Sequence, residues 1–194
     1  NIDLLAKNGT RFTDAYVTAS VCAPSRAGIL TGRYQQRFGF EHNTSRKPVG
    51  VYQLSDVGMD PKEMTLGDHM KANGYRTIAI GKWHQGEEDK HFPLNRGFDE
   101  FYGFIGGHRS FFGYKETPSR ELALFHNKER VPETEVSYLT DMFTAKATQF
   151  IEENKGKVIT KEPLNEKTPL IGTPLSPPNE KVESIGVLSN DIFN

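Results

Sequence analysis

The stretch that most constrains the fold is Tyr75–Gly81, "YRTIAIG", an apolar and β-branched run that follows Asn73-Gly74 directly. A short run with consecutive apolar residues at its end is typical of a parallel strand that is buried on both faces. The preceding segment predicts a helix with Thr65 as N-cap, Asp68 three residues later and a left-handed C-cap at Asn73-Gly74. A helix that leads into a buried strand favours an α/β domain with a largely parallel sheet.

Local patterns predict further elements on both sides of this unit. They are a short helix that ends at Asn8-Gly9, a strand over 11–17, a helix from Pro24 to about Gly32, a hairpin over 122–131 that turns at Asn127-Lys128, and an amphipathic helix from Leu139 that stops at Gly156. Residues 97–114 are predicted as a loop rich in glycine and aromatic residues. Active sites of parallel sheets lie at the carboxyl ends of the strands, where Lys82 and His84 follow the buried run.

Length and composition indicate a single globular domain. The chain has 194 residues, of which 36% are hydrophobic, and its 24 basic and 25 acidic side chains give a net charge of −1. This balance argues against a basic surface for nucleic acid, and no apolar run is long enough for a membrane span. We expect one domain over residues 1–155 and a proline-rich extended tail over 156–194, where five prolines interrupt any periodicity.

Cys22 is the only cysteine, so an internal disulfide is excluded. The thiol could be a buried small hydrophobe, a reactive nucleophile or a substrate for modification. The predicted helix places it at an N-terminus, close to Arg26, where anionic groups are favoured. The three residues between Cys22 and Arg26 are too few for the loop of protein tyrosine phosphatases.

Two motifs decide among these readings. The run "CAPSR" at 22–26, followed by "LTGR" at 30–33, resembles the signature of the type I, formylglycine-dependent sulfatases of the alkaline phosphatase superfamily. The block "GKWHQG" at 81–86 resembles the second signature of that family, and "FPLNRGFDEFYGF" at 92–104 resembles the stretch that follows it. The resemblance covers about residues 1–154. It implies an alkaline-phosphatase-like α/β sandwich with a largely parallel central sheet, of which this chain is the N-terminal part of the catalytic domain, incomplete at both ends.

The resemblance implies a role for each catalytic residue. A formylglycine-generating enzyme would read Cys22, Pro24 and Arg26 as its tag and oxidise the thiol to an aldehyde, whose hydrate is the nucleophile. Arg26 would steady the hydrate, Lys82 would contact the sulfate oxygens, and His84 would hydrogen-bond a hydrate hydroxyl and move its proton.

Other polar residues carry weaker signals. His108 stands where several family members contact substrate, and Arg109 could bind an anionic sugar, although a loop histidine capped by backbone is an equal alternative. Asp14 is interpreted as structural, and residues 87–89 as a solvated acidic turn. Asn8 and Asn43 begin glycosylation sequons, which often arise by chance.

The resemblance also implies a metal ion. Family members hold calcium, or occasionally magnesium, and Cys22 as formylglycine would be one ligand, while the other ligands are expected outside this chain. A hard dication needs about six or more oxygen ligands, which one formylglycine cannot supply.

The function expected from the resemblance is hydrolysis of a sulfate monoester, carried by a sulfated small molecule or glycan. Two alternatives remain open: a phosphonate or phosphodiester hydrolase of the same superfamily, and a catalytically inactive sulfatase-like module that binds without turnover. The resemblance also implies an exported enzyme, periplasmic, secreted or lysosomal, whose signal peptide is not in this chain.

Overall fold

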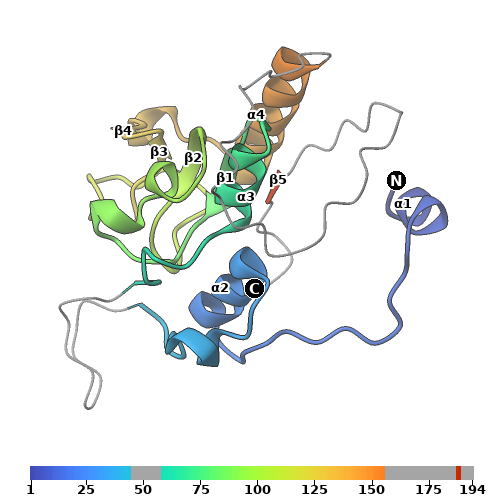
Figure 1. The fold of residues 1–194 in the computed structure, drawn as a ribbon. Helices are drawn as coiled ribbons and strands as arrows, with labels where there is room; N and C mark the ends of the chain where they lie inside the picture. The colour runs from blue at the N-terminus through green and yellow to red at the C-terminus, as the bar shows by residue number, and fades with distance from the viewer. Residues whose placement is uncertain (45–57, 156–186, 189–194) are drawn as a thin grey trace.

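The computed structural model describes residues 1–44, 58–155 and 187–188. Among these residues, five strands form one sheet in the order β4-β3-β2-β1-β5 (Figure 1). The strands are β1 (Ile78–Lys82), β2 (Glu100–Phe104), β3 (Phe125–His126), β4 (Glu129–Arg130) and β5 (Val187–Leu188). Both β2 and β5 pair parallel with β1, whereas the β3–β4 hairpin adds antiparallel to β2. The predicted α/β class is confirmed.

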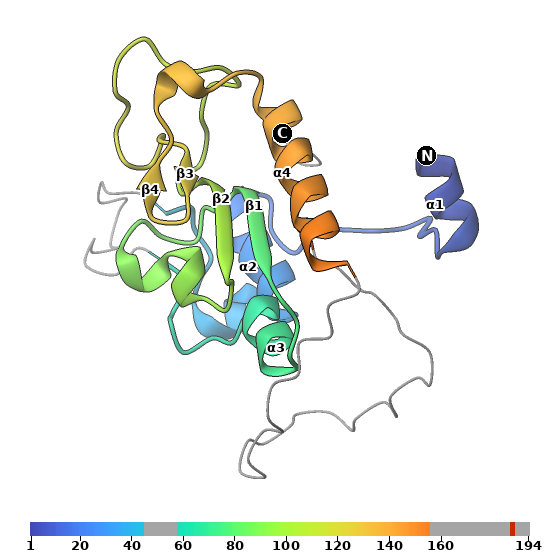
Figure 2. The same ribbon diagram turned by 90° about the horizontal axis from the view of Figure 1, so that it is seen from above.

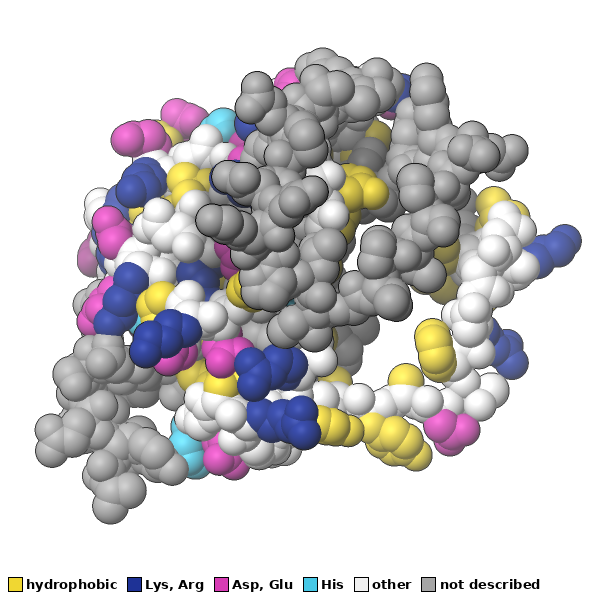
Figure 3. All heavy atoms as spheres, viewed as in Figure 1, with side chains coloured by type: hydrophobic (Ala, Val, Ile, Leu, Met, Phe, Trp, Pro, Cys, Tyr) yellow, Lys and Arg dark blue, Asp and Glu magenta, His cyan; other side chains and the backbone are white. Residues whose placement is uncertain are grey.

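The helices of the described residues fall into α-helices and short 3₁₀ turns. They are α1 (Ile2–Asn8), α2 (Cys22–Thr31), α3 (Leu66–Ala72) and α4 (Leu139–Asn154), with η1 (Gln35–Phe38), η3 (Asp89–His91), η4 (Pro93–Asn95) and η5 (Glu133–Glu135). No helix in this part of the chain is both long and apolar enough to cross a membrane. On the face shown in Figure 3, basic and acidic side chains are interspersed.

Strand β1 is buried on both faces, as its apolar run predicts. Ile78 and Ile80 point to one side, where Phe150 of α4 packs against them. Ala79 points to the other side and joins the larger cluster that contains Ala23 and Ala27 of α2. The sheet therefore lies between α4 and α2, as the two ribbon views show (Figure 2).

Several predicted elements are confirmed by their local geometry. Thr65 and Asp68 form a reciprocal capping box at the start of α3, and Gly74 follows the helix with a φ of 85°. The hairpin turns at Asn127, whose φ is 55°. The helix expected from Pro24 starts two residues earlier, at Cys22, and Gly32 ends it in the left-handed region.

Two sequence interpretations are corrected by the structure. Residues 11–17 form no strand, because no described strand lies beside them to satisfy their backbone, and Phe12 and Tyr16 are 75% and 88% exposed. The stretch 97–114, predicted as a loop, contains β2. Gly103 weakens the strand signal of this segment, because glycine is unusual inside a strand. The pairing with β1 nevertheless requires glycine at this position, since a Cβ would lie 1.9 Å from the Gly81 carbonyl oxygen.

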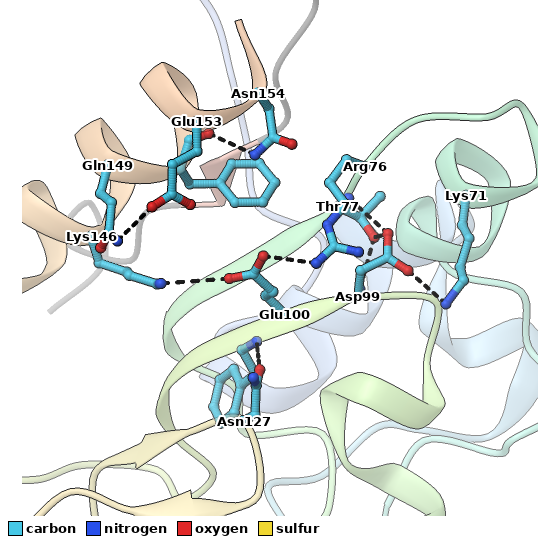
Figure 4. Close-up of polar contacts among 12 residues, drawn as sticks. Lys71, Arg76, Thr77, Asp99, Glu100, Asn127, Lys146, Gln149, Glu153 and Asn154 are labelled. Carbon is cyan, nitrogen blue, oxygen red and sulfur yellow. Dashed lines mark hydrogen bonds and ion pairs between the residues drawn. The ribbon is translucent and has the colours of Figure 1, made fainter. Parts of the chain in front are cut away.

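A polar network ties the elements together at the amino ends of β1 and β2 (Figure 4). Asp99 receives Lys71 of α3 at 2.8 Å and the backbone N–H of Thr77 at 3.1 Å. Glu100 pairs with Arg76 at 2.9 Å and with Lys146 of α4 at 3.5 Å. Ion pairs therefore fix the end of the strands opposite to the end that carries Lys82.

A buried arginine holds the segment 59–63, which precedes α3. Arg96 is 1% exposed, and its guanidinium donates to three backbone oxygens, those of Met59 at 2.9 Å, Asp60 at 3.2 Å and Glu63 at 2.8 Å. One side chain thus satisfies three carbonyl groups of the segment that leads into α3.

His91 is a second buried polar side chain in the same region. It is 1% exposed, and its Nδ1 lies 3.0 Å from the backbone oxygen of Met59. Since a carbonyl can only accept, Nδ1 carries the ring proton, and Nε2 has no hydrogen-bond partner among the described residues. Burial, and then the positive charge of Lys90, lower the pKa of His91 below its ordinary value.

We expect the protein to lose stability as the pH falls below about 6.5, because unfolded histidine takes up a proton there that folded His91 does not. The variant His91→Asn keeps an amide donor for Met59 and should flatten part of the slope between pH 7 and pH 5, measured by urea unfolding. The control His69→Asn, on an exposed position of α3, should keep the wild-type slope. Equal slopes in all three proteins would contradict the prediction.

Candidate active site

Cys22 is the first residue of α2 and is half-buried. The preceding residue, Val21, provides no side-chain cap for the helix. The carboxamide of Asn43 does so instead: its Oδ1 accepts the backbone N–H of Ala23 at 3.0 Å and lies 3.5 Å from the Cys22 Sγ. The predicted location of Cys22 at a helix N-terminus is therefore present in the structure.

His84 lies directly against Cys22. Its Nδ1 is 3.2 Å from the Sγ, although 62 residues separate the two in the sequence. The backbone of His84 follows β1 with a φ of 58°, a conformation that β-strands do not use, and its N–H donates to the Ile105 oxygen at 3.1 Å. The ring packs on Gly107, where an added Cβ would lie 2.9 Å from Nε2. The sharp turn and the close glycine together aim the imidazole at residue 22.

The surroundings of His84 keep its ring neutral. Burial lowers the pKa of His84 to about 3, and the positive charges of Lys82 and Arg26 act in the same direction. His108 also disfavours the charged ring, whereas a backbone hydrogen bond to Thr44 opposes the shift. A neutral imidazole retains a lone pair, so His84 can accept a proton from a group on the Cβ of residue 22.

Arg26 and Lys82 both bring positive charge to the surroundings of His84. The Arg26 Nη1 donates to the backbone oxygen of Lys82 at 3.1 Å, which links the first turns of α2 to the end of β1. Burial lowers the pKa of Arg26, and Cys22 partly offsets the effect. An arginine remains charged after such a shift, so the cluster presents positive charge beside the residue 22 side chain. The structure thus brings together Cys22, Arg26, Lys82 and His84.

His108 and Arg109 have different surroundings. His108 is exposed and close enough to His84 to influence its protonation. The side chain of Arg109 is fully covered: its Nη2 pairs with Glu133 at 2.9 Å, its Nε donates to Ser110, and its guanidinium lies over the Tyr114 ring. In this arrangement Arg109 fastens the loop that carries His108.

The sequence motifs do not single out two polar residues of the site, Asn43 and Gln85. Asn43 stands out in the sequence only as the first residue of a sequon. Gln85 belongs to the second motif without an assigned role, yet it is fully buried and its Nε2 donates to the backbone oxygens of Ala23 at 3.0 Å and His84 at 2.8 Å. The signal available for Gln85 is a polar residue that directly follows the histidine at the end of the buried strand.

The acidic turn at residues 87–89 is largely solvated, as expected: Glu88 and Asp89 are exposed, and only Glu87 is partly buried. Arg120 donates to the Glu87 backbone oxygen and pairs with Asp89 at 3.0 Å, so the turn is tied to the loop before β3. Asp14 accepts only from the adjacent Thr13 among the contacts of the described residues.

The donor groups near Cys22 do not by themselves suit calcium. Within the described residues, no group of three or more His, Cys, Asp or Glu side chains could hold a metal ion. The groups around residue 22 are two cations, an imidazole and one carboxamide, whereas calcium takes six to eight oxygen ligands. The described residues around Cys22 therefore do not form a calcium site on their own.

Comparison with known proteins identifies the family. The Sulfatase family model matches residues 1–160. Arylsulfatase G of Mus musculus is 42% identical over 103 residues, which are 53% of this chain and 18% of that protein, and human arylsulfatase G is 34% identical over 177 residues, 78% of this chain and 32% of that protein. An arylsulfatase of Hemicentrotus pulcherrimus is 34% identical over 170 residues, 79% of this chain and 29% of that protein.

Solved structures agree with this assignment. The crystal structure of Ps i-CgsB in complex with k-i-k-neocarrahexaose superposes with a TM-score of 0.68 at 35% identity, and covers 81% of this chain and 36% of that one. The chain spans only 18% to 32% of the length of the three arylsulfatases. Its fold is the alkaline-phosphatase-like α/β fold of these proteins, and the chain belongs to the sulfatase family.

Proposed function

We propose that the protein hydrolyses a sulfate monoester through a formylglycine made from Cys22. The observation that carries the proposal is the 3.2 Å contact between the Cys22 Sγ and the Nδ1 of a neutral His84, beside Arg26 and Lys82. A proton acceptor and two cations around one Cβ suit a nucleophile that attacks an anionic ester.

Maturation exchanges the sulfur of Cys22 for oxygen. A formylglycine-generating enzyme would oxidise Cβ by two electrons with an external oxidant such as dioxygen. The bond from Cβ to sulfur breaks, the sulfur leaves as hydrogen sulfide and an aldehyde remains, to which water adds to give two hydroxyls on one carbon. The tag residues Cys22, Pro24 and Arg26 all lie in the first turns of α2, which the modifying enzyme would read before folding. Calcium, or magnesium, remains an expected cofactor of the complete enzyme.

The hydrolysis then proceeds in two steps, a displacement at sulfur and an elimination at Cβ. One hydroxyl oxygen attacks the sulfur, the bond from sulfur to the ester oxygen breaks, and the alcohol leaves with a proton. The second hydroxyl gives its proton to His84, the carbonyl reforms, and the bond from Cβ to the sulfate oxygen breaks, which releases sulfate. Lys82 and Arg26 offset the negative charge on the sulfate oxygens, and His108, the exposed histidine nearby, contacts the substrate.

The substrate class we propose is a sulfated carbohydrate. The support is a structural relative that was solved in complex with k-i-k-neocarrahexaose and that covers 81% of this chain. We also propose that the protein is exported to the periplasm, the lysosome or the extracellular space. The support for export is membership of the sulfatase family.

The test uses protein expressed from its complete reading frame together with a formylglycine-generating enzyme. Conversion of Cys22 is read from the intact mass, and rates are measured on an aryl sulfate and on the matched aryl phosphate and phosphonate esters. We expect turnover of the sulfate to exceed that of the phosphorus esters. A preference for the phosphorus esters would instead indicate the hydrolase alternative, and fully converted protein without turnover would indicate a binding module.

A further inference from the structure

The first turn of α2 is held by a side chain from outside the helix. Asn43 lies 20 residues beyond Ala23, yet its Oδ1 accepts the Ala23 N–H at 3.0 Å. The first N–H groups of a helix have no partners within the helix, so an external acceptor fixes where the helix begins. Because α2 begins at Cys22, this bond also fixes the backbone that carries the nucleophile.

The same carboxamide contacts the side chain of residue 22. The Asn43 Oδ1 is 3.5 Å from the Cys22 Sγ. Formylglycine formation replaces this sulfur atom with oxygen. The next residue, Thr44, makes the backbone hydrogen bond to the His84 ring. Two consecutive residues therefore touch the nucleophile precursor and the proton acceptor.

We propose that Asn43 is a positioning residue that sets the orientation of residue 22 toward His84; this proposal rests on the proposed function. The carboxamide oxygen acts in two ways, as the cap of α2 and as an acceptor beside the group on Cβ. A geminal diol can rotate about its bond to Cα, and only some orientations place one hydroxyl at His84 and the other at the ester. Misplacement by about 1 Å is enough to slow a reaction by about 10²-fold.

The experiment compares Asn43→Ala with Asn43→Asp in the complete, formylglycine-bearing protein. We expect Asn43→Ala to lower kcat on an aryl sulfate by about 10- to 100-fold while KM changes by less than about threefold. Asn43→Asp keeps an acceptor oxygen and should recover to within about fivefold of the wild-type kcat. The control Asn8→Ala removes the other sequon at the end of α1 and should leave the rate unchanged.

Two further measurements separate positioning from folding and from maturation. The formylglycine content, read by mass, should be equal in all variants because Asn43 lies outside the tag. Hydrogen exchange at the Ala23 amide should be at least about tenfold faster in Asn43→Ala and near wild type in Asn43→Asp. A wild-type kcat in Asn43→Ala, or a loss in Asn43→Asp as large as in Asn43→Ala, would overturn the proposal.

The two proposals fail in different ways. If the fully converted wild type does not turn over, the proposed function is refuted and the kinetic role of Asn43 is refuted with it. If the wild type turns over and Asn43→Ala exchanges the Ala23 amide no faster, the carboxamide does not hold the helix, and only the positioning role is lost.

Discussion

Replacing Cys22 by serine is expected to abolish steady-state hydrolysis, with a loss of at least about 10³-fold in kcat, and to leave the protein sulfated on residue 22. A serine hydroxyl can attack the sulfur with help from His84, which lies 3.2 Å from the Sγ position. Its product is a simple sulfate ester. Since the serine Cβ carries no second hydroxyl, no carbonyl can form to expel the sulfate. The intact mass after incubation with an aryl sulfate should therefore show one added sulfuryl group.

The comparison needs two reference proteins. Cys22→Ala has no attacking atom, so neither the mass nor the product concentration should change. Unconverted wild-type protein, made without the modifying enzyme, carries a thiol at the same place and is expected to be inactive. Sustained turnover by Cys22→Ser near the wild-type rate would show that a single hydroxyl is sufficient, and the hydrate mechanism would have to be abandoned.

Replacing Arg96 by methionine is expected to lower the free energy of unfolding by about 3–5 kcal/mol. Methionine fills much of the same volume but removes the donors that now reach the backbone oxygens of Asp60 and Glu63 at 3.2 and 2.8 Å. It also removes one of the two donors to the Met59 oxygen, which keeps only the His91 N–H. Each buried acceptor left unsatisfied costs about 1–3 kcal/mol. Urea unfolding of the wild type and the variant measures the difference.

The control is an arginine of the same chemistry at an exposed position. Arg76 pairs with Glu100 at 2.9 Å, but 42% of its side chain is accessible, and such pairs contribute about 0–1 kcal/mol. Arg76→Met should therefore be nearly neutral. If Arg96→Met does not accumulate as folded protein, Arg96→Lys, which keeps a charge with fewer donors, should fold with an intermediate loss. Equal stability of Arg96→Met and Arg76→Met would contradict the role assigned to the buried guanidinium.

The elements that the sequence predicts well have signals within a few residues. The capping box of Thr65 and Asp68, the turn at Asn127 and the apolar run around Ile80 are local, so they predict α3, the hairpin and β1. Strand formation at 11–17 depends instead on a partner strand, and local alternation cannot report whether one is present. Strand β2 shows the converse effect. Gly103 weakens its local strand signal, but the close approach of the Gly81 backbone in β1 requires a glycine there.

The candidate site divides in the same way. Cys22, Arg26, Lys82 and His84 lie in two motifs, and parallel-sheet geometry predicts that these motifs meet at one edge. Asn43 lies outside both catalytic motifs. Its contact with Ala23 depends on the path of the segment after η1, which returns to the start of α2. Arg109 shows the opposite effect: a cation in a family-like loop suggested anion binding, whereas its covered side chain pairs with Glu133.

The pairing of Gly81 with Gly103 sets a limit on how this protein can diversify. A side chain on Gly103 would collide with the Gly81 backbone, so any larger residue would push β1 away from β2. Lys82 and His84 follow immediately, and they would move with the strand. The proposed chemistry therefore depends on a glycine that lies outside the candidate site, because a side chain at position 103 would shift the strand end that carries Lys82 and His84.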